Sequence, residues 1–221
     1  MLLIKSLPIS EQVFAKQPFS SDLGEKIVVA GIRLMDKLGL EAFTFKKLAA
    51  HIGSTEASIY RYFTNKHMFF VYASNLYWRW LESRIMQLSH EKFSHYHRLE
   101  AAIAAVVSPT LDGDESEFPY RSLVNIITSE GPKVYLTKWV DSENKEGVFL
   151  AYKSLCEALS QLILNVNPNY SFSHSLASTI IETAHDQLFF SQHLPRLTDI
   201  DKDNTEQLNE FLVHTVASAL D

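Results

Sequence analysis

The segment Thr55–Lys66, TEASIYRYFTNK, concentrates side chains that can bind an anion. Arg61 lies between Tyr60 and Tyr62, and a lysine follows in the next turn. A guanidinium can donate hydrogen bonds to guanine or to phosphate, and tyrosine hydroxyls can donate to phosphate oxygens. This spacing therefore favours binding to nucleic acid.

A short helix that begins after Thr55 would sort these side chains by direction. At about 100° per residue, Ile59 and Phe63 point to one side, which we assign to the core. The outward set is Ala57, Ser58 and Arg61, and the two flanking residues are Tyr60 and Tyr62. Small outward residues let a helix backbone approach the bases, while the flanking hydroxyls reach the two phosphate strands.

Neighbouring residues extend the same predicted surface. Thr44 can cap the preceding helix and touch a phosphate, and two lysines project from that helix's first turn. Glu56 can accept a hydrogen bond from cytosine, although a carboxylate in a first turn is also favourable with the helix dipole. Lys66 places a positive charge at the start of the next helix, where exposed N–H groups also favour an anion. The predicted DNA-binding residues are Thr44, Lys46, Lys47, Thr55, Glu56, Ala57, Ser58, Tyr60, Arg61, Tyr62 and Lys66.

Three short helices and one long helix are predicted to position these residues. Asp22 followed by Glu25 resembles a capping box, and Gly39 is expected to end the first helix. Ser/Thr or Asn caps and glycine breakers then define the second, third and fourth helices. Their boundaries are Thr44 to Gly53, Thr55 onward, and Asn65 to about Leu88.

Later segments keep the helical period, and alternating strand patterns bounded by turn dipeptides are absent. We expect helices near 99–107, after Pro119, over 148–166, over 173–193 and over 205–220, with an acidic loop, DGDESEFP, before Pro119. The predicted fold class is all-α. Residues 1–20 carry no sustained period and include Pro8 and Pro18, so we expect an irregular arm.

Charge is divided unevenly along the chain. The 221 residues carry a net charge of -6, yet residues 21–67 hold seven basic and five acidic side chains, a balance of +2, whereas residues 68–221 stand at -9. This asymmetry indicates a small surface for an anionic partner, joined to a body that repels it. No apolar run reaches the roughly 18 residues that span a bilayer, so we expect no membrane partner and a cytoplasmic protein.

The run GLEAFTFKKLAAHIGSTEASIYRYFTNK, residues 39–66, resembles the DNA-binding signature of TetR-type (TetR/AcrR-like) transcriptional regulators. The matching features are Gly39, Thr44, Leu48-Ala49, Gly53, Thr55, Ile59-Tyr60, Tyr62-Phe63 and Asn65 with Lys66. Ser54 departs from the pattern, because the family commonly has a small apolar residue there. The resemblance implies a helix-turn-helix domain over 21–67 and a larger helical domain over 68–221 that binds an effector and forms the dimer.

The last two predicted helices are apolar over more than one face. Such helices need partners on two sides, either within one core or in an intermolecular four-helix bundle. The bundle agrees with the dimer that the resemblance implies. The predicted dimer contacts are Leu176, Ile180, Ala184, Leu188, Leu208, Phe211, Leu212 and Val216.

We therefore expect a homodimeric regulator that binds a palindromic operator in double-stranded DNA, most simply a repressor released by a small apolar or amphipathic effector. Aromatic residues near mid-chain are the candidates for an effector pocket. They are Tyr77, Trp80, Tyr135, Trp139, Phe149, Tyr152 and His185. An alternative is a DNA-binding protein without an effector, whose C-terminal domain binds another protein.

An all-helical enzyme is a more distant alternative. His90, His95 and His97 cluster near Glu91, but their spacing fits no HExxH site and no pair on one helix face. His185 and Asp186 are adjacent, so they point about 100° apart and form no relay. Cys156, the single cysteine, lies in an apolar helical pattern typical of a buried thiol. We predict no catalytic residue, metal or cofactor.

Overall fold

A computed structural model describes residues 14, 16–89, 93–108, 118–202 and 204–221. Within these ranges the chain forms helices and no strand, which confirms the predicted all-α class. None of the helices in the described ranges is both long and apolar enough to cross a membrane. Residues 112–117 of the acidic loop, His90, Glu91 and most of the expected arm lie outside the described residues.

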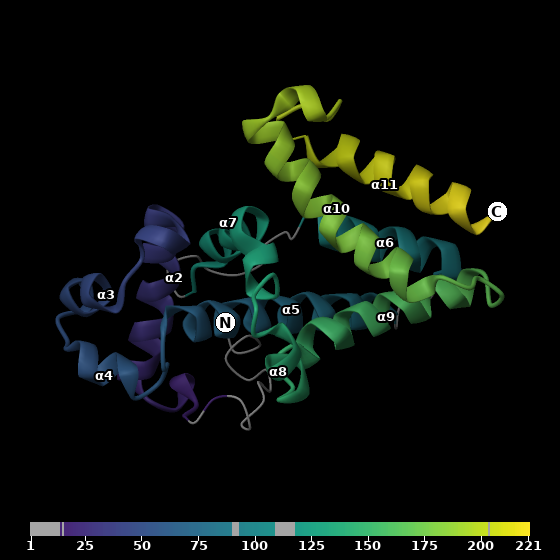
Figure 1. Cartoon of the computed structure of the whole chain (residues 1–221). Helices are drawn as coiled ribbons and strands as arrows, with labels where there is room; N and C mark the ends of the chain where they lie inside the picture. The colour runs from purple at the N-terminus through teal and green to yellow at the C-terminus, as the bar shows by residue number, and fades with distance from the viewer. Residues whose placement is uncertain (1–13, 15, 90–92, 109–117, 203) are drawn as a thin grey trace. The chain divides into compact units, whose positions relative to one another are not determined.

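The chain divides into two compact units. The first comprises Met1–Trp80 and Leu111–Ala151, and the second comprises Leu81–Thr110 and Tyr152–Asp221. The first unit contains η1 (Pro18–Ser20), α2 (Asp22–Ala42), α3 (Phe45–Ile52), α4 (Glu56–Tyr60), the first part of α5 (Lys66–Ser89), α7 (Tyr120–Glu130), η2 (Gly131–Val134) and α8 (Val140–Lys145) (Figure 1).

Polar side chains set the helix starts in the first unit. The hydroxyls of Thr44 and Thr55 each accept a hydrogen bond from the backbone three residues on, both at 3.2 Å. Asn65 Oδ1 accepts from the N–H of Met68 at 2.9 Å. These three predicted caps are confirmed. The first helix differs, because Ser21 rather than Asp22 is its cap and accepts from the N–H of Gly24 at 3.2 Å.

Glycines bend the chain where the sequence predicted helix ends. Gly53 follows α3 with φ 67°, in the left-handed region that suits a residue without Cβ. Gly39 has φ 74° and ψ 160°, but α2 resumes after it and ends at Ala42. Gly39 therefore ends the first helical segment as predicted, and a second short segment follows it across a kink within α2.

An aromatic cluster joins the short helices to α5. The ring centroid of Phe69 lies 5.4 Å from that of Phe43 and 5.1 Å from that of Phe63. The ring centroids of Phe63 and Tyr72 are 5.3 Å apart. All four side chains are buried. Rings in these arrangements contribute about 0.5–1.5 kcal/mol per pair beyond their buried area, so the cluster fixes the first turns of α5 against the short helices.

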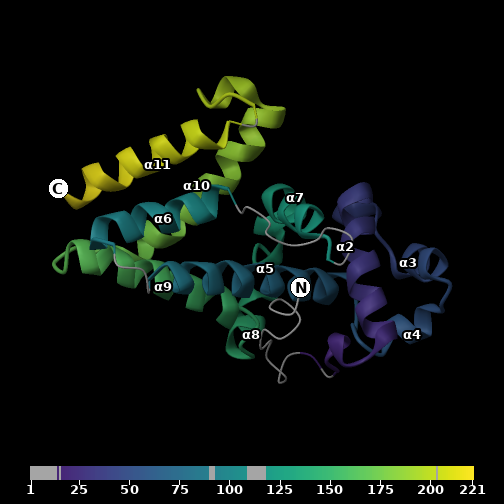
Figure 2. The same cartoon turned by 180° about the vertical axis from the view of Figure 1, so that it is seen from behind.

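The second unit contains the rest of α5, α6 (His95–Val107), nearly all of α9 (Leu150–Val166), α10 (Ser173–His193), η3 (Pro195–Leu197) and α11 (Thr205–Leu220). Helices α6, α10 and α11 pack against one another (Figure 2). This packing changes the interpretation of the predicted dimer contacts, because six of them are already buried within one chain. They are Leu176, Ile180, Ala184, Leu208, Leu212 and Val216.

Helix α6 therefore covers part of the wide apolar surface of α10 and α11 that these two helices do not cover for each other. Of the predicted dimer contacts, only Leu188, which is half-buried, and Phe211, which is 43% exposed, keep accessible side chains. The six buried side chains lie in the core of a single chain, and a dimer contact through α10 and α11 stays a prediction.

Candidate nucleic-acid interface

Helix α4 presents the predicted faces except at Ser58, which is half-buried and whose Oγ lies 3.0 Å from Thr55 Oγ1. Ile59 is fully buried, whereas Ala57 and Tyr60 are exposed, the latter by 53%. Arg61 follows the helix as its C-cap and is also exposed. The guanidinium thus lies on the solvent side of a helix whose apolar side is anchored in the core, and it is accessible to an anionic partner.

Tyr62 lies differently from the expectation of an exposed flank, since only 5% of it is accessible. Its hydroxyl hydrogen-bonds Ser21 Oγ at 2.8 Å, and Lys16 Nζ lies 4.4 Å from its ring centroid. The reason for the difference is that Ser21, at the start of α2, and Lys16 cover this side of the segment. A role in phosphate binding stays a prediction.

Helix α3 contributes exposed polar groups beside α4. Its N-cap Thr44 and its residues Lys46 and Lys47 are exposed, as is Glu56 at the start of α4. Lys47 Nζ donates to the carbonyl of Ala42 at 2.7 Å, so this ammonium partly serves the end of α2. Lys46 is exposed, and its contact with a phosphate stays a prediction.

Lys66 is more constrained than the sequence suggested. Its Nζ donates to the carbonyls of Leu40 and Glu41 at 2.9 and 3.0 Å. An ammonium has three donors, so one remains for a further acceptor. Lys66 thus stabilises the end of α2 by donating hydrogen bonds to its carbonyls. Its role in binding DNA stays a prediction.

Glu130 is a positioning residue that sequence analysis missed. Its Oε1 accepts a hydrogen bond from the N–H of Leu40 at 3.2 Å, and its Oε2 lies 2.5 Å from Lys133 Nζ. The carboxylate thereby holds α7 to the end of α2, directly before α3. No local pattern could have indicated a contact between residues 90 positions apart.

The predicted effector residues occupy different environments. Tyr77, Trp80, Phe149 and His185 are buried, while Trp139 is 59% exposed. Tyr135 and Tyr152 are half-buried, and the Tyr152 hydroxyl donates to Glu182. The two units divide the set, with Tyr152 and His185 in the second and the other five in the first. A pocket in the first unit, described below, contains Trp139 alone from this set.

One polar cluster has the outline of a hydrolase triad. His174 Nε2 lies 2.8 Å from Glu157 Oε2, and its Nδ1 lies 3.3 Å from Ser160 Oγ. Ser160, however, is fully buried, and its hydroxyl donates to Ser173 Oγ at 2.8 Å. A nucleophile must reach its substrate, so we assign this cluster to the packing of α9 against α10.

The other chemically interesting groups have structural surroundings. His95 and His97 lie in the first turn of α6 rather than in a loop, and His97 Nδ1 lies 2.7 Å from Ser94 Oγ. Burial, with a contribution from the Glu182 carboxylate, raises the pKa of the Cys156 thiol to about 11. A thiol with this pKa is almost entirely protonated at neutral pH and is a poor nucleophile.

Residues 27–73, which contain most of α2, all of α3 and α4 and the start of α5, match the family "Bacterial regulatory proteins, tetR family". No curated protein matches the sequence.

Solved structures share the fold at low sequence identity. A complex of AibR with isovaleryl coenzyme A and operator DNA is 16% identical, with a TM-score of 0.58, 86% of this chain covered and 95% of the other. A tetR-family regulatory protein from Rhodococcus RHA1 is 14% identical, with a TM-score of 0.62 and coverages of 89% and 97%. The ketosteroid regulator KstR2 of Mycobacterium tuberculosis is 13% identical, with a TM-score of 0.54 and coverages of 88% and 93%.

Proposed function

Because this chain carries the DNA-binding domain of the tetR family of bacterial regulatory proteins, we propose that it is a homodimeric transcriptional repressor that a small molecule releases from its operator. It is a regulator rather than an enzyme. As a protein that acts on bacterial DNA, it works in the cytoplasm.

The observation that carries the proposal is the disposition of α4. Ile59 and Phe63 anchor this short helix in the core, and Arg61 is exposed beside it. In a helix-turn-helix the second short helix enters the major groove, where arginine can form two hydrogen bonds with guanine. We assign the predicted DNA-binding residues of α3 and α4 to this surface, while Tyr62 and Lys66 contact α2 and its N-cap.

A dimer places two copies of α4 on one face of the duplex. Recognition helices about 34–36 Å apart match one turn of B-DNA and thus a palindromic operator. We assign the dimer contact to α10 and α11, in which Leu188 and Phe211 keep accessible apolar surface. The remaining predicted contacts act indirectly, since they form the core that holds these two helices.

Release needs only a modest coupling between effector and DNA. A coupling free energy of about 1–3 kcal/mol changes operator affinity by about 5- to 150-fold. AibR is a relative in fold that has been crystallised with an acyl coenzyme A and with operator DNA. By analogy, we propose that an apolar or amphipathic effector binds this chain and favours a state in which the two copies of α4 no longer match the operator.

The test begins with genomic DNA fragments that purified protein selects, followed by binding measurements on the recovered site. Arg61→Ala should weaken binding by about 1–3 kcal/mol and relax base preference. Arg61→Lys keeps the charge but loses the paired hydrogen bonds to guanine. Its DNA binding should therefore keep the same salt dependence but lose the preference for the operator sequence. Arg196→Ala, which alters an exposed arginine in η3, is the matched control and should leave binding unchanged.

Two results would reject the proposal. One is duplex binding that does not weaken as salt rises, because phosphate contacts release counterions and must be salt-dependent. The other is equal operator affinity for Arg61→Ala and the parent, because α4 would then not face the groove.

A further inference from the structure

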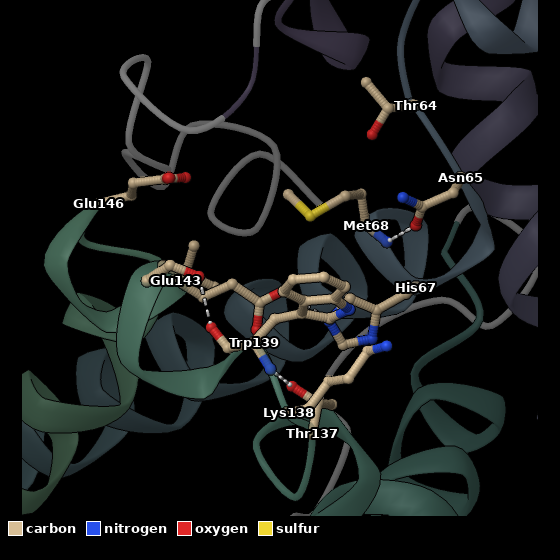
Figure 3. A pocket seen from close by; sticks show the side chains of 11 residues that line it. Thr64, Asn65, His67, Met68, Thr137, Lys138, Trp139, Glu143 and Glu146 are labelled. Carbon is tan, nitrogen blue, oxygen red and sulfur yellow. Dashed lines mark hydrogen bonds and ion pairs between the residues drawn. The ribbon is translucent and has the colours of Figure 1, made fainter.

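A hollow in the first unit lies where α5 begins. It has a volume of about 600 Å³. One wall comes from the start of α5 and the residues before it, and the other from the segment 137–148, which includes α8 (Figure 3). Its lining residues are Thr64, Asn65, His67, Met68, Thr137, Lys138, Trp139, Ser142, Glu143, Glu146 and Val148.

Glu143 is the polar centre of this hollow, and half of its carboxylate has no donor. The side chain is only 13% exposed, and Oε1 lies 3.0 Å from His67 Nε2. Oε2 is buried and accepts no hydrogen bond from any residue that the structure describes. A buried oxygen without a donor costs about 1–3 kcal/mol, and more when the group is charged. A carboxylate that is short of donors is stabilised by a cationic N–H donor that approaches it.

Trp139 supplies an aromatic surface in the same hollow. Its side chain is 59% exposed, an unusual position for the largest apolar side chain. Lys138 Nζ lies 4.7 Å from the ring centroid, so one cation already rests on the indole. An exposed lysine is readily displaced, and the ring can then hold another cation at a gain of about 0.5–2 kcal/mol.

The charges of the lining favour the same class of ligand. Glu143 and Glu146 carry two negative charges, against one positive charge on Lys138. Met68 and Val148 add apolar surface. We propose that this hollow binds an organic cation with a small flat apolar group, whose N–H donors bond the Glu143 carboxylate in place of His67 and whose ring stacks on Trp139.

This inference rests on the proposed function where it concerns DNA. His67 lies in the first turn of α5, directly after the segment that carries Tyr62 and Phe63. The bond between His67 and Glu143 ties that turn to α8. A cation that competes for the carboxylate weakens this tie and loosens the support of α4, so operator affinity falls. By linkage, bound operator must then lower the affinity for the cation by the same factor.

Benzamidinium, benzamide and benzoate form a probe set of nearly one shape with three charge states. Isothermal titration of the full chain should give a Kd below about 1 mM for benzamidinium and binding at least about tenfold weaker for the other two. Fluorescence gives a second readout, because Trp78 and Trp80 are buried and Trp139 is the exposed tryptophan. Benzamidinium should therefore protect Trp139 from quenching by acrylamide.

Variants separate the two contacts. Glu143→Gln should weaken benzamidinium binding by about tenfold, the value of a charge-assisted hydrogen bond. Trp139→Ala should weaken it by about threefold or more, whereas Trp139→Phe should retain most of the affinity while losing the fluorescence signal. Glu206→Gln, at an exposed glutamate of α11, is the matched control and should bind as the parent does.

The outcomes keep the pocket and the DNA function apart. Equal affinity for benzamidinium and benzamide, or an unaffected Glu143→Gln variant, overturns the cation site whatever the protein does with DNA. Binding of benzamidinium with no change in operator affinity rejects the link to α4 and leaves the site. A protein that binds benzamidinium but no duplex rejects the proposed function alone.

Discussion

Tyr62 links the end of the recognition segment to the start of α2. The Ser21 hydroxyl hydrogen-bonds the Tyr62 hydroxyl at 2.8 Å and also accepts from the N–H of Gly24. The hydrogen bond from Ser21 lowers the pKa of Tyr62, although burial acts in the opposite direction. One oxygen thus caps a helix and holds the phenol next to Arg61, so the position of this phenol depends on a residue 41 positions earlier.

Replacing Tyr62 by phenylalanine should lower the free energy of unfolding by about 1 kcal/mol, because one partly buried hydrogen bond is lost. Urea denaturation measures this change. Ser21→Ala should cost more, since the helix cap is lost as well. If Tyr62 also touches a phosphate, Tyr62→Phe weakens binding to all duplex sequences alike, and unchanged duplex affinity would limit the residue to a structural role.

His185 is a source of acid sensitivity in the second unit. Burial lowers the pKa of His185 to about 4 from 6.5. Below pH 6.5 the unfolded chain takes up a proton that the folded chain refuses, so stability falls as pH drops from about 6.5 to about 4. The free energy of unfolding is lowered by about 3 kcal/mol near pH 4 and is not lowered by this group above pH 6.5.

Unfolding measured from pH 7 to pH 4 tests this prediction. His185→Gln removes the titrating ring, and its stability should change less over this window than that of the parent. If the free energy of unfolding depends on pH identically in the two proteins, the pKa of His185 is not lowered in the folded chain.

Among the elements, those specified by local chemistry were predictable. The caps at Thr44, Thr55 and Asn65 follow from side chains that bond their own helix, and the structure confirms them. Helix α8 was missed because its sequence, VDSENK, has no apolar period, and no residue of it is buried. The environment of Tyr62 was missed because its partner Ser21 lies 41 residues earlier, and no local pattern indicates such a contact.

Long-range contacts could not be predicted. The carboxylate of Glu130 bonds a backbone group 90 residues away, and the wide apolar stripes of α10 and α11 gave no indication of whether α6 or a second chain would cover them. Periodicity shows that a face must be buried but does not identify what covers it.

The contact of α2 with α5 depends on a glycine in the middle of a helix. A Cβ at Gly31 would lie 2.4 Å from Phe69 Cζ, and this ring is fully buried between its aromatic neighbours. We expect Gly31→Ala to destabilise the fold by about 1–3 kcal/mol. Intrinsic propensity alone predicts the opposite sign, a gain of about 1 kcal/mol.

Chemical denaturation decides between these signs. Phe69→Leu removes the ring atoms that clash, so the cost of Gly31→Ala should shrink in that background. A more stable Gly31→Ala protein would mean that Phe69 moves aside without loss.

For the whole molecule, the uneven charge has a consequence for assembly on DNA. The net -9 of residues 68–221 repels a duplex, whereas residues 21–67 carry +2. Affinity must therefore come from a few well-placed contacts, and doubling them in a dimer is the simplest way to obtain it.

Phe211→Asp tests the proposed dimer contact through α10 and α11. The side chain is 43% exposed on α11, and a buried charge in the contact should raise the dissociation constant of the dimer by about 100-fold. Sedimentation measures this, and operator affinity should fall in parallel. Phe172→Asp alters another exposed phenylalanine of the same unit and is the control. A dimer that is unaffected by Phe211→Asp would place the contact elsewhere.

The protonated state of Cys156 makes this chain a convenient host for site-directed labels. With a pKa of about 11, only about one thiol in ten thousand is a thiolate at pH 7, and thiolates are what maleimide and nitroxide reagents attack. A cysteine introduced at exposed Ala57 would thus react against a nearly silent background. Paired spin labels there would report directly how far apart two copies of α4 stand, with and without an effector.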